Sequence, residues 1–126
     1  MSSYWGLLKL GSIIRSVRQF LAVQNDTLGV VYKIDEDLVT VVFEGGAIYD
    51  MYHTDLERYV KLVAIDPGDR APKNMSSALP TLHGKVKTLS MFKGLYDSGK
   101  FNKYFAIGRH LLDNRPSSHL LEEELV

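Results

Sequence analysis

A series of short β-branched segments, separated by turn residues, constrains the fold more than any other feature of this sequence. The segments are rich in Val, Ile, Tyr and Phe, which favour a pleated and half-buried backbone. Short connections of the kind seen here join neighbouring strands as antiparallel hairpins. The sequence therefore predicts strands at residues 28–34, 38–43, 47–52 and 58–63.

The residues between these segments indicate where each strand ends. The acidic run 35–37 favours a turn, because short carboxylates bond the local backbone instead of a strand ladder. The glycine pair 45–46 tolerates the positive φ angles that a tight hairpin requires. Residues 53–57 are expected to form one helical turn, with Thr54 or Asp55 as the capping residue.

Residues 12–22 permit two interpretations. Apolar side chains at positions 13, 14, 17, 20 and 21 share one helical face, and Ser12 could cap that helix. Alternatively, Gly11 precedes a strand that ends near Arg15, and a long loop follows from Phe20 to Thr27. We favour the strand, because the downstream strands need a partner to close a sheet edge.

The second half of the chain predicts helices. Residues 67–80 are rich in Pro, Gly, Ser and Asn, which is typical of a linker or a surface loop. Apolar residues then recur every three or four positions from Thr81 to a stop at Gly99, and again from Phe101 to Asn114. The short connection between these stripes predicts an antiparallel helical hairpin.

The order of the N-terminal features resembles a known fold. A glycine-led first strand, a long loop, three β-branched strands, a helical turn and a closing strand are similar to the small SH3-like barrels. The likeness is to the KOW-type and Tudor-like group and to the small photosystem-accessory barrels. It covers about residues 7–65, and it leaves function open because such barrels carry many unrelated roles. The residues that carry it are Gly29, Val30, Val31, Ile34, Asp35, Val39, Thr40, Val41, Gly45, Gly46, Asp55, Leu56 and Glu57.

These observations predict an α+β chain: a small five-stranded SH3-like antiparallel barrel followed by a C-terminal helical hairpin. We place the barrel in residues 1–66, a linker in 67–80, the hairpin in 81–115 and a flexible acidic tail in 116–126. The tail ends in an apolar–acidic sequence, and Trp5 near the other end is expected to be a packing anchor or a contact for a partner.

Composition narrows the functional classes. A length of 126 residues suits one domain with an appendage. The absence of cysteine excludes a disulfide scaffold and thiol chemistry. Fifteen Lys and Arg balance fifteen Asp and Glu, so no overall charge drives the chain toward nucleic acid or anionic lipid. No apolar run approaches the ~20 residues of a membrane span, and the first residues lack a secretory signal. We expect a soluble, cytoplasmic protein with no membrane partner.

No sequence pattern points to catalysis. The chain lacks a nucleophile elbow, a His-Glu-x-x-His pair and a phosphate-binding loop. Strand alternation would send Asp50 and His53 to opposite faces, so that pair and Asp55 do not predict a metal site. We therefore predict a protein that is not an enzyme, with no cofactor, no metal and no evident small-molecule substrate.

We expect the partner of this chain to be another protein. Residues 1–66 hold six basic and nine acidic side chains, and several acids fall in predicted loops. We expect the contact surface to comprise the long loop and the hairpin tips of the barrel, as in an adaptor, an accessory subunit or a small phage- or element-encoded regulator. The predicted partner-binding residues are Arg18, Asp26, Asp35, Glu36, Asp37 and Glu44.

Two alternatives remain open. Basic residues interleaved with aromatics in the predicted helices would suit a nucleic-acid-associated protein of transcription or translation, although the charges encircle the first helix instead of forming a stripe. The barrel aromatics Tyr32, Phe43, Tyr49, Tyr52 and Tyr59 could instead form a cage for a cationic side chain, as in Tudor-like proteins. The candidate nucleic-acid contacts are Lys85, Lys87, Lys100, Lys103 and Arg109.

Overall fold

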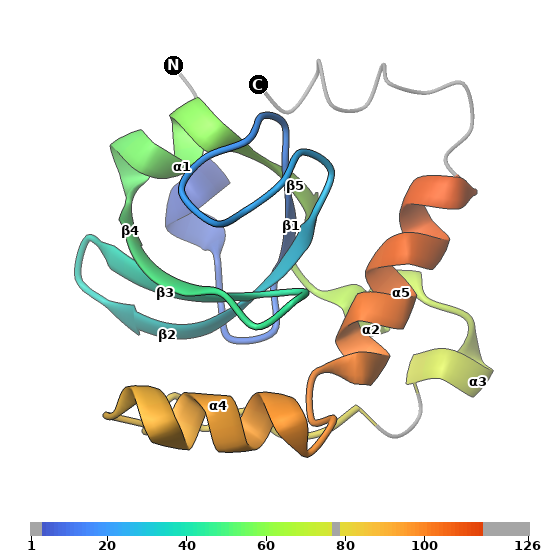
Figure 1. Ribbon diagram of the computed structural model, residues 1–126. Helices are drawn as coiled ribbons and strands as arrows, with labels where there is room; N and C mark the ends of the chain where they lie inside the picture. The colour runs from blue at the N-terminus through green and yellow to red at the C-terminus, as the bar shows by residue number, and fades with distance from the viewer. Residues whose placement is uncertain (1–3, 77–78, 115–126) are drawn as a thin grey trace.

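The computed structural model describes residues 4–76 and 79–114 and has an α+β architecture (Figure 1). Five strands form one antiparallel sheet in the order β4-β3-β2-β1-β5. Figure 1 shows that the sheet curls round on itself like a small barrel and that α4 and α5 lie outside it. The strands are β1 (Ile13–Ser16), β2 (Leu28–Asp35), β3 (Leu38–Phe43), β4 (Ile48–Tyr52) and β5 (Val60–Ala64).

Helices connect and cover the strands. The helix α1 connects β4 to β5, which are the two edge strands of the sheet. None of the helices within the described ranges is both long and apolar enough to cross a membrane. The helices are η1 (Tyr4–Leu7, a 3-10 helix), α1 (His53–Tyr59), α2 (Pro67–Arg70), α3 (Lys73–Ser76), α4 (Leu89–Asp97) and α5 (Asn102–Asp113).

The segment with two interpretations contains a strand, as favoured. Both edges of β1 are paired, because Ile14 lies opposite Gly29 of β2 and Leu62 of β5. Residues 17–27 follow as the predicted long loop. The helical interpretation is wrong because β1 supplies the ladder that joins β2 to β5.

The expected helical turn after β4 is a longer helix. It extends over seven residues, so Arg58 and Tyr59 are helical and the last strand begins at Val60 instead of residue 58. Asp55 does stabilise the helix start, but from within the first turn: its Oδ2 accepts a hydrogen bond from the Tyr52 N–H at 3.1 Å.

One hydrophobic cluster fills the inside of the curled sheet. Alternate residues of β2 and β3 point inward, and Gly29 is required among them because a Cβ there would lie 2.6 Å from Val41 Cγ1. Trp5 is 3% exposed, so it is a packing anchor. We call this set the inner cluster: Trp5, Leu8, Ile14, Phe20, Val23, Val31, Val39, Val41, Phe43, Met51, Leu56, Val60 and Leu62.

A second cluster covers the opposite face of β1, β2 and β3. Side chains from α4, α5 and the segment 79–88 pack there, and α5 comes so close at Gly108 that a Cβ would lie 2.9 Å from Ile13 Cγ2. The first five residues of β2 are therefore buried on both faces. We call this set the outer cluster: Ile13, Leu28, Val30, Tyr32, Val42, Leu82, Val86, Phe92, Phe101, Tyr104, Phe105 and Ile107.

The first C-terminal helix is shorter than predicted. It begins at Leu89 instead of Thr81, and Thr88 caps it by accepting a hydrogen bond from the Met91 N–H at 3.3 Å. Residues 79–87 form neither helix nor strand, because Gly84 has φ +67° and a Cβ there would lie 3.0 Å from the Tyr32 carbonyl oxygen. This segment therefore lies against β2 in an irregular conformation.

The two predicted C-terminal helices are present, but they diverge instead of lying antiparallel along each other (Figure 1). Figure 1 shows α4 running across one part of the sheet while α5 turns away over another part. Each apolar stripe packs on the outer face of the sheet, which is itself apolar, and the helices also meet where the rings of Tyr96 and Phe105 lie 6.4 Å apart. The expected linker contains α2 and α3, and the expected tail, residues 116–126, lies outside the described residues.

Candidate partner-binding groove

A hollow of about 360 Å³ lies along the inner side of β4. Its walls come from three elements: the loop of residues 17–27, the strand β4, and the helix α1. We call it the β4 groove. Its lining residues are Gln19, Phe20, Leu21, Tyr49, Asp50, Met51, Asp55 and Tyr59.

The loop that walls the groove has a fixed local conformation. Phe20 and Val23 exchange backbone hydrogen bonds of 3.0 and 2.8 Å, which closes a two-residue turn. At the tip of that turn Leu21 has φ +49° and is 75% exposed. A leucine is rarely found in this left-handed region, and strain of this kind gathers at ligand-contacting sites. The Ala22 N–H donates to the Tyr49 hydroxyl at 3.1 Å, which ties the turn to β4.

Three aromatic rings form the floor of the groove. Phe20 stacks on Tyr59 with ring centroids 4.7 Å apart, and it lies 6.3 Å from the tilted ring of Tyr49. The Arg58 guanidinium lies 5.9 Å from the Tyr59 centroid, so a cation already contacts this ring. The stacked pair leaves no space for a ligand between its faces. A ligand in the groove can therefore contact these rings only from the side that faces the hollow.

The five-ring cage considered from the sequence does not form. Tyr49 and Tyr59 line the groove, but Phe43 is buried in the inner cluster. Tyr32 points to the opposite face of the sheet, where it meets Phe92 and Phe101 edge-on. The alternation of side chains along β2, β3 and β4 is the physical reason, because it separates these rings between two faces.

Within residues 4–76 and 79–114, no strand pairs with the edge of β4 that faces away from β3. The Phe43 N–H donates to the Ala47 carbonyl at 2.8 Å, which fixes the hydrogen-bonding phase of the β3–β4 pair. In that phase Tyr49 and Met51 bond to β3, and the N–H and C=O groups of the residues between them point to the open edge. The Tyr52 N–H, at the end of the strand, bonds to Asp55. The open edge thus presents the backbone of Ile48 and Asp50.

The groove carries negative charge. Two of its lining residues are carboxylates, Asp50 and Asp55, and none is basic. The Asp50 carboxylate accepts a hydrogen bond from Thr40 Oγ1 at 2.5 Å, which holds it on the outer face of the sheet. Asp55 uses one oxygen for the Tyr52 N–H, and a carboxylate can accept further hydrogen bonds.

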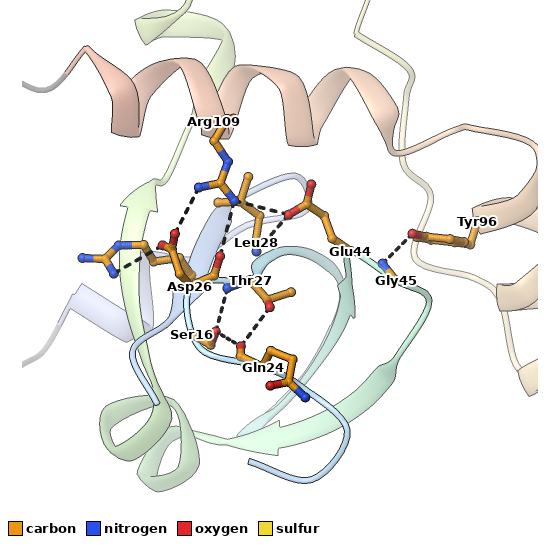
Figure 2. A network of polar contacts seen from close by, with 10 residues as sticks. Ser16, Gln24, Asp26, Thr27, Leu28, Glu44, Gly45, Tyr96 and Arg109 are labelled. Atoms are coloured by element: carbon orange, nitrogen blue, oxygen red, sulfur yellow. Dashed lines mark hydrogen bonds and ion pairs between the residues drawn. The ribbon is translucent and has the colours of Figure 1, made fainter. Parts of the chain in front are cut away.

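Two of the predicted partner-binding residues bond within the chain (Figure 2). Arg109 of α5 pairs with Asp26 at 3.4 Å and with Glu44 at 3.5 Å, and it also donates to the Asp26 carbonyl at 3.3 Å. Glu44 accepts from the Leu28 N–H at 3.3 Å. Asp26 and Glu44 therefore attach α5 to one end of the barrel, and Arg109, predicted as a nucleic-acid contact, is their partner.

The same end of the long loop is held by hydroxyl groups. Ser16 Oγ donates to the Gln24 carbonyl at 2.6 Å and accepts from the Thr27 N–H at 2.8 Å. The Tyr96 hydroxyl accepts a hydrogen bond from the Gly45 N–H at 2.5 Å. Figure 2 shows these contacts side by side, so the base of the loop is fixed while its turn lies at the groove.

The remaining predicted acids lie at the other end of the sheet. Asp35 ends β2, and Glu36 and Asp37 form the exposed turn to β3, with Glu36 at φ +56°. An eight-residue strand separates this turn from Leu28, a distance of roughly 24 Å at 3.4 Å per residue. The predicted acidic rim is thus two separate sites. Arg18 is exposed on the long loop, next to the groove residue Gln19.

The predicted nucleic-acid contacts are spread over several elements. Lys85 and Lys87 are exposed on the segment 79–88, whereas Lys100 and Lys103 are half-buried around the start of α5. Three of the aromatic side chains among them, Phe101, Tyr104 and Phe105, are 1%, 6% and 7% exposed, and Tyr96 is half-buried with its hydroxyl bonded to Gly45. The three buried rings cannot stack on bases.

Neither a search for metal ligands nor comparison with known proteins indicates a function. Within residues 4–76 and 79–114, no three His, Asp or Glu side chains come together as metal ligands would. Comparison of the chain with protein-family models, with curated proteins and with solved structures gave no significant match. The geometry of the β4 groove therefore carries the functional interpretation.

Proposed function

We propose that the protein is a non-catalytic binding module of the SH3-like barrel class that acts as an adaptor, accessory subunit or small regulator by holding another protein in the β4 groove. The strand order, with α1 between the last two strands, supports the barrel class. The single observation that carries the function is the open edge of β4 beside a formed, aromatic-floored hollow. An unpaired sheet edge is a ready template for another chain.

A partner in the groove would account for the exposure of Leu21 and for its strained backbone, neither of which the packing of the fold requires. Leu21 exposes an apolar side chain in a strained conformation at the rim. A partner that covered this side chain would gain apolar contact at no cost in loop ordering, because the loop is already fixed at both ends. Nucleic acid receives less support, because Arg109 is paired with Asp26 and Glu44 and three of the interleaved aromatics are buried.

The proposal is tested by affinity capture from source-cell lysate with tagged wild-type protein and two matched variants. Leu21→Asp changes the groove rim, and Leu89→Asp changes a leucine of similar exposure, 71%, at the start of α4. We expect Leu21→Asp to weaken capture of a stoichiometric protein partner by about tenfold, the effect of losing one buried apolar contact. Leu89→Asp should capture as wild type does.

Two further arms separate the alternatives. Charge reversal of Asp35, Glu36 and Asp37 to Lys should leave capture unchanged, since that turn lies at the far end of the sheet. A nuclease-treated sample should retain the partner. Loss of capture with nuclease, or with the Leu89 variant but not the Leu21 variant, would contradict the groove as the binding site.

A further inference from the structure

We propose that the occupant of the β4 groove is an extended segment of the partner protein, which pairs with β4 as a sixth strand and sets a Lys or Arg side chain beside Asp55. This inference rests on the proposed function and specifies the conformation and the charge of the partner segment. It is carried by the hydrogen-bonding phase of β4 and by the charge of the groove, which are separate observations.

The backbone of β4 defines where such a strand can bind. Ile48 and Asp50 present their N–H and C=O groups to the open edge, two residues apart, as an added antiparallel strand needs. Each would exchange a pair of hydrogen bonds with one residue of the incoming segment. Asp55 occupies the Tyr52 N–H and so ends the available ladder at that point. The partner segment is therefore short, with about four residues in contact with the edge.

Charge selects the side chain that enters the groove. The lining holds the Asp55 carboxylate and no basic residue, so a cation of the partner meets complementary charge, whereas the Asp50 carboxylate is bonded to Thr40 on the outer face. Asp55 lies where the ladder ends, with acceptor capacity beyond the Tyr52 N–H. The methylene stem of a Lys or Arg can lie along the Tyr49 ring while its charged end reaches that carboxylate.

The side of the groove across from Asp55 favours apolar residues in the partner segment. Leu21 presents an exposed side chain at the rim, and Met51 and Phe20 supply the apolar floor. A segment with a β-branched residue two positions before or after its Lys or Arg matches these contacts, because alternate side chains of a strand share one face. A proline in the paired portion would remove a required donor.

The test begins with selection of random ten-residue peptides displayed on phage against the full chain. We expect enriched peptides to carry one Lys or Arg among β-branched residues and to lack central proline. The same selection is run on Asp50→Pro and on Asp50→Ala. Both substitutions remove the carboxylate, but only proline removes the edge N–H, so only Asp50→Pro should abolish enrichment. Thermal melting of both variants checks that they are folded.

Chemical changes in the peptide avoid any effect on folding of the protein. Synthetic versions of an enriched peptide carry an N-methyl group at one backbone position at a time. We expect alternate positions to lose about tenfold or more in affinity, as expected for lost backbone hydrogen bonds, and intervening positions to keep it. Replacement of the peptide Lys by norleucine should weaken binding to the wild type by about tenfold and change little with Asp55→Asn.

The outcomes are distinct. Amide-shift mapping that places the peptides away from β4, Leu21 and Tyr49 would overturn the proposed function and this inference together. Peptides that map to the groove but show a flat N-methyl scan would overturn strand addition alone. Failure of any peptide to enrich over the Asp50→Pro variant would also overturn it. Concentration-dependent dimerisation of the free chain through β4 would assign the edge to a second copy instead of a partner segment.

Discussion

The inner and outer clusters bury opposite faces of the same three strands, but they are assembled from different parts of the chain. The inner cluster uses residues that follow one another from Trp5 to Leu62. The outer cluster joins β1, β2 and β3 to side chains of residues 82–107. The comparison shows that the C-terminal part is a second wall of the sheet and not an appendage, because without it the outer face of β2 would be exposed apolar surface.

The largest expected effect tests whether the two clusters are one cooperative unit. Phe43→Ala in the inner cluster and Phe101→Ala in the outer cluster each remove a ring that is at most 1% exposed. Each should lower the free energy of unfolding by about 3–5 kcal/mol, the usual cost of truncating a buried Phe. Urea unfolding followed by far-ultraviolet circular dichroism and by tyrosine fluorescence should give one coincident transition for both variants.

Separate unfolding transitions would show that the inner and outer clusters are not one cooperative unit. If Phe101→Ala melted the helices while the sheet kept its own later transition, the clusters would fold independently. Leu89→Ala on the exposed side of α4 is the control, because that side chain is 71% exposed and should change the free energy of unfolding by less than about 0.5 kcal/mol.

A smaller effect sharpens the comparison at two glycines, one for each cluster. Gly29→Ala would place a Cβ 2.6 Å from Val41 on the inner side, and Gly108→Ala would place one 2.9 Å from Ile13 on the outer side. Each should destabilise the fold by about 1–3 kcal/mol through overpacking. Gly94→Ala in α4 meets nothing within 4 Å and should stabilise by up to about 1 kcal/mol. Chemical denaturation gives the free energy of unfolding of the three variants. If Gly29→Ala or Gly108→Ala changed it no more than Gly94→Ala does, close packing at that glycine would be contradicted.

The smallest expected effect concerns the ion pair between Lys9, which precedes β1, and Asp66, which follows β5. Lys9 and Asp66 pair at 2.7 Å, and the Lys9 ammonium lowers the pKa of the Asp66 carboxyl below its usual range. A lowered folded pKa means that the pair stabilises the fold above about pH 4, the ordinary aspartate pKa, and that this is lost as pH falls through the lower folded value. The effect is small because both side chains are exposed and solvent screens them.

Asp66→Asn isolates this contribution. The difference in urea midpoint between the variant and the wild type should be present at pH 7 and disappear near pH 2–3. A difference that persisted at low pH would show that the carboxylate charge is not its cause.

Sequence patterns predicted the strands of the sheet better than the C-terminal segments that pack on its outer face. Period-two alternation and turn residues placed β2, β3 and β4 within one or two residues, and the need for an edge partner favoured β1 correctly. The helix α4 was extended wrongly because Leu82 and Val86 are four residues apart, a helical spacing. Both are buried, yet Gly84 between them has a positive φ, so the chain reaches the same cluster without a helix. Spacing alone does not distinguish these conformations.

The β4 groove was only partly predictable. The long loop was expected to be a contact surface, and its residues Gln19 and Leu21 do line the groove. Asp55 was recognised only as a cap, although its position at the end of β4 could have indicated a second role. The open edge depends on strand order and hydrogen-bonding phase, which residues far apart in the sequence decide together. The same is true of Arg109, whose partners lie in two different loops.

The two-sided burial of β2 has a consequence for synthesis of the protein. The strands that line the barrel are translated by residue 64, but the side chains that cover their outer face extend to Ile107. Adding residues 65–107 takes about 2–9 s at about 5–20 residues per second. Throughout that interval the residues of all five strands have been synthesised but those that cover their apolar outer face have not, so the sheet cannot reach its final packing until α5 has been made.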